Sequence, residues 1–405
     1  MFSNTAWSIY NFRLGLIKAL RAEGNIIHVV VPPDKTYVPR LQEIGCEVTT
    51  IPMDNMGTNP LRDGALLLRY LKYLYKAQPE LSILFTIKPV IYGAIASWVT
   101  RTPSISVITG LGTAFITDNL LTRIVEGLYR VALRFSDKVF FLNSEDVSIF
   151  YSRGIIHDAR LITTIPGEGV DLSVFKKELK ESVGINSNYV HLIQGSGIDL
   201  DRFNLANNNN SFSFILMARM IRDKGVIEFV DAARMLKQRF PTVKFKLLGY
   251  VGIKNRGAIT QKEIDHWVAE GVVEYLGSAS DVRPFLMEAN CVVLPSYREG
   301  ISRTLLEAAA MSLPIVTTNV PGCRDVVEDG INGFLCAPRS AHDLADKLAL
   351  LLELSDEQRA EMGRRGREKI EREFDEKIVI DKYLAAIAEI ANRSKSALSG
   401  RRLPD

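Results

Sequence analysis

Two successive series of apolar, strand-like runs separated by helical stretches constrain the fold of this chain more than any other feature. The first series comprises residues 26–31, 47–51, 82–85, 104–108 and 138–142, and the second comprises residues 212–217, 245–249, 272–277, 291–295 and 314–317. Runs of β-branched residues that are apolar on both faces are typical of parallel strands buried beneath helices. The pattern therefore predicts an α/β protein built from two doubly wound, Rossmann-like halves.

A duplicated motif marks the expected junction between the halves. The segment IPGEGVDLSVF at 165–175 returns as IQGSGIDLDRF at 193–203. We expect the second copy to connect the halves, because a polar run of four asparagines follows it before the next strand, and the first copy to be an insertion near the hinge. The predicted domains are therefore an N-terminal domain, a C-terminal domain and a flexible tail at residues 1–203, 204–392 and 393–405.

The start of the chain lacks a complete first strand. The first residues, Met-Phe-Ser-Asn-Thr, run almost at once into a helical pattern at 11–21, whose apolar positions recur at helical spacing. In a parallel sheet a buried strand normally precedes the first helix. We therefore expect a stub of that strand here, with residues lost or with translation starting upstream of Met1.

Composition argues against several classes of function. The chain has 405 residues, of which 47% are hydrophobic and 24% charged, and its formal net charge of +3 gives no bulk attraction to nucleic acid. Its four cysteines and five histidines lack the spacing of a disulfide framework, a zinc site or a redox motif. No metal is expected, and the cysteine usage indicates a reducing cytoplasm. We find no signal peptide and no apolar run long enough to span a bilayer.

A strand-to-helix turn in the second half carries two cations. The turn 218–225 (ARMIRDKG) contains Arg219 and Lys224 and leads into a helix at 226–239. Cationic side chains and free N–H groups at a helix start converge on one point, which predicts an anion-binding site. Gly249 lies at the end of the next strand. Because glycine has no side chain, we expect a second close approach of the backbone here, at the same edge of the sheet.

A second loop, SYREGIS, leaves the carboxyl end of a buried strand. Glu299 lies in the loop, and Glu307 lies eight residues later in the following helix. Gly300 allows a turn in which the amides of Ile301 and Ser302 point outward from the helix start. Since open α/β sheets bind ligands at the carboxyl ends of their strands, we expect a diphosphate on these amides, Glu307 on a ribose diol and Glu299 facing a sugar.

These motifs resemble a known family. The segment SYREGISRTLLEAAAMSLPIVTTNVPGCRDVVEDGINGF resembles the E-x7-E region of the retaining glycosyltransferases of family 4, and ARMIRDKG resembles their phosphate-binding turn. The segments WSIYNFRLGLIKAL, MDNMGTNP, FTIKPVIYG and VITGLGTAF are similar to those of the bacterial branch that extends polyprenyl-diphosphate-linked sugars, such as the N-acetylgalactosaminyltransferases acting on diacetylbacillosaminyl-diphospho-undecaprenol. The resemblance implies the GT-B fold, with two Rossmann-like domains facing across a cleft. The chain departs from the family in its missing first strand, in its doubled motif and in Ala218, where the family usually has glycine.

The resemblance also implies a UDP-sugar donor and a role for each motif residue. Arg219 and Lys224 would neutralise the leaving diphosphate in place of a metal ion, and Glu299 would bind hydroxyls of the donor sugar. The nucleotide-sugar would be held by Gly249, Gly300, Ile301, Ser302 and Glu307. No cofactor is implied, and no side chain is needed as a nucleophile, because the departing phosphate oxygen takes the proton of the acceptor hydroxyl.

The first half would then bind the acceptor, a lipid-linked sugar. The candidate contacts are Arg13 and Lys88 for its phosphate, the glycine-rich turn Thr109, Gly110, Leu111, Gly112 and Thr113, and the polar residues Asp54, Asn55 and Asn59 for sugar hydroxyls. Read in isolation, each cation is also typical of a solvated side chain, and the turn is also typical of an ordinary connection.

Two stretches of the first half, 66–76 and 120–134, mix Arg or Lys with Leu, Tyr and Ile at helical spacing. Such a helix lies on an anionic leaflet or buries its apolar face in its own domain. With a lipid-linked acceptor, we expect a peripheral protein on the cytoplasmic face of the inner membrane. The expected partners are the UDP-sugar, the lipid-linked sugar and an anionic membrane surface, without nucleic acid.

The predicted function is transfer of a hexose or N-acetylhexosamine from a UDP-sugar to a polyprenyl-diphosphate-linked sugar in bacterial surface glycan assembly. Two alternatives stay open: a UDP-sugar-modifying enzyme such as a 2-epimerase, and a transferase to a soluble acceptor. An epimerase needs acid and base groups in the cleft, which the few histidines fit poorly. In a non-catalytic sugar-nucleotide-binding protein, some of the four residues Arg219, Lys224, Glu299 and Glu307 would be missing. Here all four are present.

Overall fold

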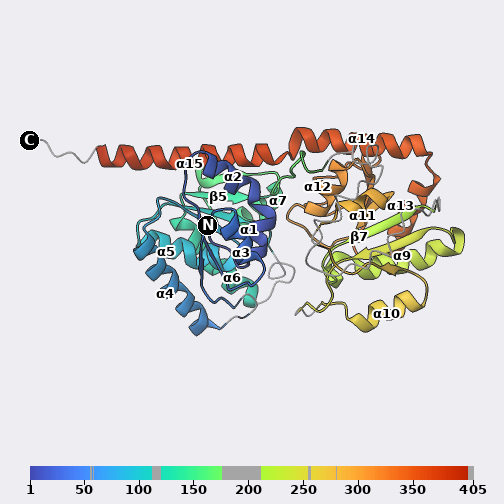
Figure 1. Ribbon diagram of the computed structural model, residues 1–405, viewed down its shortest axis with the longest axis horizontal. Helices are drawn as coiled ribbons and strands as arrows, with labels where there is room; N and C mark the ends of the chain where they lie inside the picture. Colours follow the sequence, from blue (N-terminus) through green and yellow to red (C-terminus); the bar gives the residue numbers. More distant parts are fainter. Residues whose placement is uncertain are drawn as a thin grey trace, which may run out of the picture. The chain divides into compact units, whose positions relative to one another are not determined.

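The chain forms two compact α/β units, which confirms the predicted fold class (Figure 1). The computed structural model describes residues 1–54, 57, 59–111, 120–175, 211–253, 257–279 and 281–399. The first unit comprises Met1–Gly169 together with the C-terminal helix α15 (Glu376–Ser399), and the second unit comprises Val170–Asp375.

The parallel sheet of the first unit has a doubly wound strand order. β1 pairs with β2, and β3, β4, β5 and β6 pair in that order. Phe2 joins the two groups, because it forms parallel bridges to Val30 of β1 and to Leu84 of β3. The expected stub of a first strand is thus confirmed, and it occupies the centre of the sheet. The strands are β1 (His28–Val31), β2 (Glu47–Thr50), β3 (Ser82–Phe85), β4 (Ser104–Ile108), β5 (Lys138–Phe141) and β6 (Ile162–Thr164).

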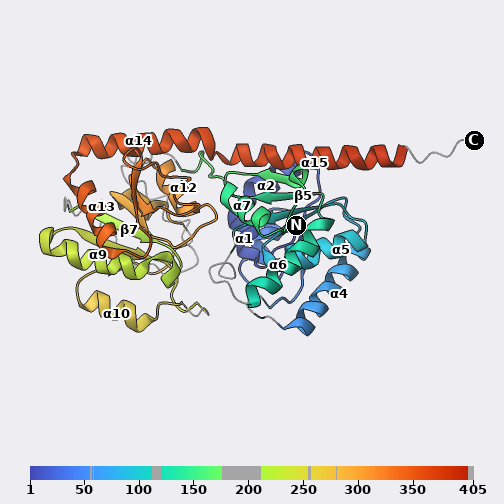
Figure 2. The same ribbon diagram turned by 180° about the vertical axis from the view of Figure 1, so that it is seen from behind.

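Helices cover both faces of this sheet. On one face, Phe2, Leu84 and Phe141 share an apolar core with side chains of α4, α5, α6 and α7. On the other face, α2 packs beside α15 (Figure 2), and the Tyr383 ring lies 4.8 Å from that of Phe140. The helices and helical turns are α1 (Ala6–Phe12), α2 (Leu14–Ala22), α3 (Tyr37–Glu43), α4 (Pro60–Ala77), the π-helical turn η1 (Pro89–Gly93), α5 (Ala94–Val99), α6 (Leu120–Ala132), η3 (Leu133–Phe135), α7 (Ser144–Ser152) and η4 (Ala159–Leu161).

The second unit has a six-stranded parallel sheet in the order β12-β11-β10-β7-β8-β9. In the unit's own chain order this is 6-5-4-1-2-3, which is the Rossmann order, with its reversal between β7 and β10. The strands are β7 (Ser213–Met217), β8 (Lys244–Leu248), β9 (Glu274–Tyr275), β10 (Cys291–Leu294), β11 (Ile315–Thr318) and β12 (Gly333–Cys336).

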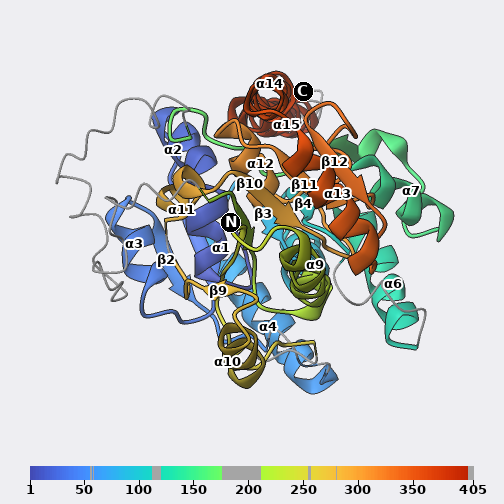
Figure 3. The same cartoon turned by 90° about the vertical axis from the view of Figure 1, so that its right-hand side faces the viewer.

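Alternate side chains of β7 enter two different apolar cores, because both faces of the sheet are covered. Phe214 and Leu216 pack with side chains of α9, α10 and α13, whereas Ile215 and Met217 pack with those of α11, α12 and α14. Figure 3 shows α9 and α13 lying together beside this sheet. The helices are η7 (Arg222–Lys224), α9 (Val226–Arg239), α10 (Gln261–Ala269), α11 (Arg283–Glu288), α12 (Arg303–Ala310), α13 (Ala341–Glu353) and α14 (Asp356–Glu373).

The junction between the units differs from the predicted boundary at 203/204. The chain leaves the first unit at Gly169, inside the first copy of the duplicated motif, and Phe175 of that copy is buried in the core of the second unit. Gly167 and Gly169 both have positive φ, +65° and +69°, which suits glycine in this tight connection. The second copy, 193–203, lies outside the described residues.

The return of the chain to the first unit explains this difference. Val170 donates a backbone hydrogen bond to the carbonyl of Phe374 (3.0 Å), and a Cβ at Gly169 would come within 2.5 Å of the Cα atom of Glu376. The segment that leaves the first unit at Gly169 and the segment that returns to it at Glu376 therefore pack against each other. The described residues Glu376–Ser399 therefore belong to the first unit rather than to a C-terminal domain, and α15 continues through 393–399, where a flexible tail was expected.

Candidate active site

The two motifs of the second unit meet at the carboxyl ends of β7 and β10, which are neighbours in the sheet. The turn 218–225 leaves β7, and the loop 296–302 leaves β10. The strand order reverses at this point, and open α/β sheets bind ligands in the crevice at such a switch point. The structure therefore brings together the residues that the sequence assigned to one anion-binding and sugar-binding site.

Lys224 and Glu299 form an ion pair that joins the turn to the loop. Both side chains are largely buried, with 17% and 12% of their surface exposed. The hydroxyl of Ser296 donates to the same Glu299 oxygen at 2.7 Å, and the amide of Tyr297 donates to the carbonyl of Asp223 at 2.9 Å. Two of the three predicted catalytic residues are therefore fixed against each other at the switch point.

Arg219, the third predicted catalytic residue, is exposed on the same turn. Within the described part of the chain it has no hydrogen-bond or ion-pair partner for its guanidinium group. The neighbouring Arg222 pairs instead with Glu263 at 2.6 Å. Since Lys224 is already paired, Arg219 carries the uncompensated positive charge of the turn.

Two glycines permit the close approach of these strand ends. Gly225 has a φ of +71°, and a Cβ there would overlap the carbonyl oxygen of Pro295 at the end of β10. A Cβ at Gly249 would overlap the carbonyl oxygen of Ala218. The close backbone approach expected at Gly249 is thus present, and any side chain there would displace the start of the turn 218–225.

The helix start after β10 differs in one detail from the expectation. The amide of Ser302 donates a long hydrogen bond (3.4 Å) to the carbonyl of Gly322, so it does not point freely outward. A Cβ at Gly322 would come within 2.5 Å of the carbonyl oxygen of Gly300. The loop after β11 therefore packs closely against the loop 296–302. Among the described residues the amide of Ile301 has no acceptor, which leaves it available to a ligand.

Glu307 lies inside α12 and is held by Arg303, whose Nε donates to its carboxylate at 2.8 Å. Burial raises the pKa of the Glu307 carboxyl group above its ordinary value, while the guanidinium of Arg303 opposes that shift. The hydroxyl of Thr304 donates to the carbonyl of Met217 at 3.2 Å, which ties the start of α12 to the end of β7. Glu307 is therefore paired with Arg303 and lies close to the switch point.

The predicted acceptor residues of the first unit lie near the carboxyl ends of two neighbouring strands. Arg13 follows α1 and lies against Phe85 at the end of β3, whereas Lys88 comes after β3, and Thr109 and Gly110 come after β4. Since carboxyl ends of parallel strands lie at one edge of a sheet, the structure brings these residues to a common edge. Gly110 has a φ of +121°, a backbone conformation that favours glycine. Three further candidates, Asn55, Gly112 and Thr113, lie outside the described residues.

Arg13 interrupts the single helix predicted at 11–21 and separates α1 from α2. Its side chain is 3% exposed, forms an ion pair with Glu168 and lies 4.4 Å from the centre of the Phe85 ring. Burial of the guanidinium against this strand residue explains the break, because a continuous helix would direct it elsewhere. The charge of Arg13 is thus satisfied within the protein.

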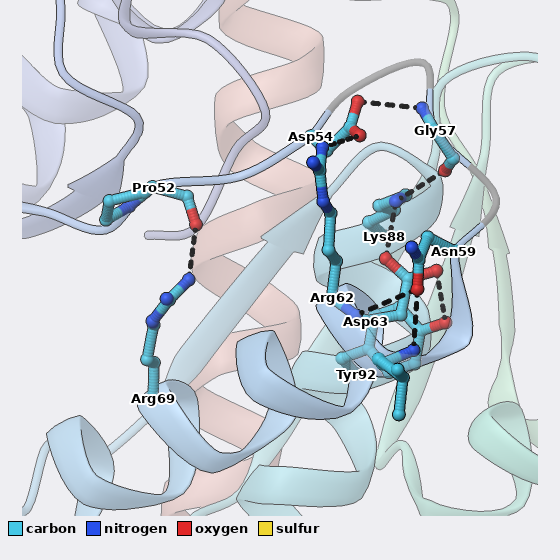
Figure 4. A network of polar contacts seen from close by, with 10 residues as sticks. Pro52, Asp54, Gly57, Asn59, Arg62, Asp63, Arg69, Lys88 and Tyr92 are labelled. Atoms are coloured by element: carbon cyan, nitrogen blue, oxygen red, sulfur yellow. Dashed lines mark hydrogen bonds and ion pairs between the residues drawn. The ribbon is translucent and has the colours of Figure 1, made fainter.

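Lys88 is also paired. Its ammonium group donates to Asp63 at 2.5 Å and to the carbonyl of Gly57 at 2.8 Å, and the second Asp63 oxygen accepts a hydrogen bond from Tyr92 at 3.1 Å (Figure 4). In the same network, Asp54 pairs with Arg62, and Asn59 caps the N-terminus of α4 (Figure 4). Neither cation predicted to contact the acceptor phosphate therefore carries an uncompensated charge.

Comparison with known proteins identifies the class of this chain. Residues 1–143 match the family model described as glycosyl transferase 4-like, and residues 197–369 match that of glycosyl transferases group 1. Together the two matches cover most of both units. The chain is a glycosyltransferase.

Several relatives extend over nearly the whole glycosyltransferase chain. The N,N'-diacetylbacillosaminyl-diphospho-undecaprenol alpha-1,3-N-acetylgalactosaminyltransferase of Campylobacter jejuni is 27% identical over 396 residues, covering 94% of this chain and 96% of the relative. The capsular polysaccharide biosynthesis glycosyltransferase CapM of Staphylococcus aureus is 27% identical over 384 residues, covering 90% of both. The solved structure of Anabaena Alr3699/HepE in complex with UDP and glucose superposes with a TM-score of 0.75 at 21% identity, covering 96% and 98% of the two chains. The expected GT-B fold and enzyme class are confirmed.

One contact beside the candidate site of this glycosyltransferase escaped the sequence analysis. The hydroxyl of Tyr297 donates to Glu228 at 2.7 Å, and the guanidinium of Arg339 lies 4.4 Å from the centre of the Tyr297 ring. Burial raises the pKa of the Tyr297 hydroxyl, so it remains a hydrogen-bond donor. The contact holds the loop after β10 against the first turn of α9. The available signal was Glu228 itself, an acidic residue in the first turn of the helix that follows the turn 218–225.

The glycosyltransferase offers no metal site within the ranges that the structure describes, where no group of three or more His, Cys, Asp or Glu side chains converges. Its four cysteines are all buried and unpaired, and burial raises the pKa of the Cys323 thiol to about 12. No helix in the described ranges is both long enough and apolar enough to cross a membrane.

Proposed function

We propose that this glycosyltransferase moves a hexose or N-acetylhexosamine from a UDP-sugar to a polyprenyl-diphosphate-linked sugar, with retention of the anomeric configuration, in bacterial surface glycan assembly. The observation that carries this proposal is the pairing of Lys224 with Glu299 at the switch point, beside the uncompensated Arg219. The UDP complex of the structural neighbour supports the donor class. The Campylobacter relative, whose name specifies a diphospho-undecaprenol-linked acceptor, supports the acceptor class.

In this proposal the donor diphosphate lies against the phosphate turn and the start of α12. Arg219 and Lys224 neutralise the charge that develops on the departing phosphate, and the Ile301 amide donates to the diphosphate. As the anion approaches Lys224, Glu299 is released from its ion pair to bind donor-sugar hydroxyls. Glu307 binds the ribose diol.

The chemical step then needs no protein nucleophile. The acceptor hydroxyl attacks the anomeric carbon from the face that the diphosphate leaves, so that the new glycosidic bond forms where the old bond to the phosphate oxygen breaks. That phosphate oxygen takes the proton of the hydroxyl group. The products are UDP and the extended acceptor.

A substrate panel tests the proposed reaction. Purified protein is incubated with each of several UDP-sugars and a short-chain prenyl-diphosphate-linked sugar, and the products are identified by mass spectrometry. We expect one hexose or N-acetylhexosamine to be added to the lipid-linked sugar. Conversion of the UDP-sugar to an isomer without transfer would instead indicate an epimerase.

Activity is expected to be independent of divalent metal ions. Arg219 and Lys224 supply the positive charge that a metal ion would otherwise bring to the diphosphate. Transfer rates should therefore be equal with EDTA, with magnesium and with manganese. Loss of activity on chelation, restored by either metal, would show that the cations do not carry this role.

We further propose that the first unit docks on the cytoplasmic leaflet of the inner membrane. Its helices α4 and α6 present exposed apolar side chains at helical spacing, and α5 packs between α4 and the η3 turn that continues α6. The exposed apolar residues of α4 and α6 are Leu61, Leu68, Tyr75, Leu120, Leu121, Ile124 and Val131. The exposed basic residues of α4, α6 and the η3 turn are Arg62, Arg69, Lys72, Lys76, Arg123 and Arg134. Apolar burial combined with attraction to anionic lipid is the usual basis of peripheral binding.

Vesicle co-sedimentation across a salt series tests this docking. We expect binding to vesicles with anionic lipid at low salt, with each basic contact contributing about 1 kcal/mol and fading as salt rises. The double variant Leu68→Ser, Ile124→Ser should bind more weakly, whereas Leu350→Ser, an exposed leucine on α13, should bind like the wild type. Absence of binding at low salt would contradict the docking.

A further inference from the structure

A compact polar cluster in the first unit has no role in the donor site. It consists of Asp63, Lys88 and Tyr92, and we call it the Lys88 cluster (Figure 4). The side chains of Lys88 and Asp63 are 15% and 14% exposed, so the pair is mostly shielded from solvent but remains accessible. Lys88 follows β3, and Asp63 lies in the first turn of α4, so the cluster sits at the carboxyl edge of the sheet.

The cluster carries no net charge, because the ammonium group and the carboxylate compensate each other. Lys88 uses two of its three N–H donors, on Asp63 and on the carbonyl of Gly57, and each Asp63 oxygen accepts one hydrogen bond with capacity for more. The cluster thus offers both donors and acceptors. A diphosphate requires an excess of positive charge, whereas a sugar ring presents neutral hydroxyl groups that both donate and accept.

The backbone that carries Lys88 and Tyr92 is strained. Thr86, directly after β3, has a φ of +70°, which is unfavourable for a β-branched residue, and its hydroxyl is buried without a partner among the described residues. The next turn, Pro89–Gly93, is π-helical rather than α-helical. Strained residues and π-helical turns are enriched at functional sites. Because the cluster geometry depends on this segment, the strain supports a binding role.

We propose that the Lys88 cluster binds a hydroxyl group of the acceptor's sugar ring rather than its diphosphate, an inference that rests on the proposed acceptor class. Asp63 accepts a hydrogen bond from that hydroxyl, and the remaining N–H of Lys88 donates to the same or an adjacent oxygen. Tyr92 is a positioning residue, since it holds the second oxygen of Asp63. The ligand class is a neutral pyranose.

Steady-state kinetics with matched acceptors test this assignment. The acceptors are the prenyl-diphosphate sugar that the wild type uses best in the substrate panel, its monophosphate analogue, and its monodeoxy analogues. The variants are Asp63→Asn, Lys88→Met, Lys88→Arg and Tyr92→Phe. The matched control is Lys138→Met, because Lys138 also pairs with a carboxylate (Glu389, 2.9 Å) and a carbonyl, but begins β5 at the opposite edge of the sheet.

We expect Asp63→Asn and Lys88→Met to raise the acceptor KM about tenfold, as loss of one hydrogen bond to a charged group would, equally for diphosphate and monophosphate forms, with the donor KM unchanged. On the one deoxy analogue that lacks the bound hydroxyl, these penalties should vanish. Lys88→Arg should not restore the wild-type acceptor KM, because a guanidinium preserves the charge but not the geometry of the ammonium group. Tyr92→Phe should raise the acceptor KM about threefold and keep kcat, and Lys138→Met should match the wild type.

Two results would overturn the inference. One is a Lys88→Met penalty that disappears on the monophosphate acceptor and is rescued by arginine, which would assign Lys88 to the diphosphate. The other is a penalty that persists on every deoxy analogue, as a general structural defect would give. If the wild type extends a free sugar and no lipid-linked one, the proposed acceptor class fails, and the deoxy series of that free sugar decides the role of the cluster independently.

Discussion

Replacement of Lys224 by alanine is expected to lower kcat for transfer by about two to three orders of magnitude. Removing a preorganised group that stabilises charge developing in the transition state typically costs about 2.7–4 kcal/mol. The side chain lies on the η7 turn rather than in an apolar core, so little packing is lost. The substitution also leaves Glu299, 12% exposed, without its cationic partner. Arg219→Ala should have a loss of similar size, since it removes the uncompensated charge of the same turn.

Arg222→Ala is the matched control for both substitutions. Arg222 lies in the same turn, but its guanidinium pairs with Glu263 at 2.6 Å and not with the loop after β10. Its removal should leave kcat close to that of the wild type. Turnover like the wild type at saturating donor in both Lys224→Ala and Arg219→Ala would remove the basis for the phosphate assignment.

Gly249→Ala is expected to destabilise the second unit by about 2–3 kcal/mol, the cost typical of forcing extra atoms into a closely packed site. The added Cβ would overlap the carbonyl oxygen of Ala218, and backbone cannot move aside as a flexible side chain can. Because Ala218 begins the turn 218–225, which we propose holds the donor diphosphate, the affinity for UDP should also fall. Urea unfolding followed by tryptophan fluorescence measures the stability, with Trp267 buried in this unit and Trp7 and Trp98 reporting on the first unit, and calorimetric titration measures UDP binding.

Gly64→Ala provides the control for this substitution. Gly64 lies on the exposed face of α4, and a Cβ there would meet no atom within 4 Å. An alanine in a helix interior is favoured over glycine by about 0.5–1 kcal/mol, so this variant should be slightly more stable than the wild type. An unfolding midpoint and a UDP affinity like those of the wild type in Gly249→Ala would contradict the close approach of the strand ends.

The central strands of both sheets were predictable because burial on both faces leaves an uninterrupted apolar run. Ser82–Phe85 and Ser104–Ile108 occur as expected, and every residue of these two strands is buried. The edge strands β6 and β12 were missed, because β6 is three residues long with no buried residue and β12 is a run of only four residues, two of them partly exposed. The break at Arg13 was missed for a different reason. It depends on contacts with Glu168 and Phe85, which lie far away in the sequence.

The convergence of the donor motifs was also predictable, because both follow parallel strands and carboxyl ends share one edge. The ion-pair partners of the charged residues could not be predicted. Lys224 pairs with a carboxylate 75 residues away, and Lys88 pairs with one 25 residues away. A sequence shows where charges occur but not which of them compensate each other. The same limit applies to the junction at Gly169, which is set by the return of the chain at Glu376.

The central claim is retaining transfer to a lipid-linked sugar, and a competition assay tests it most directly. The preferred UDP-sugar is offered to an equimolar mixture of the prenyl-diphosphate-linked sugar and the same sugar in free form. Mass spectrometry follows both products, and proton NMR assigns the anomeric configuration of the new bond. We expect the lipid-linked sugar alone to be extended, with the configuration of the donor retained. Equal extension of the free sugar, or an inverted linkage, would contradict the account.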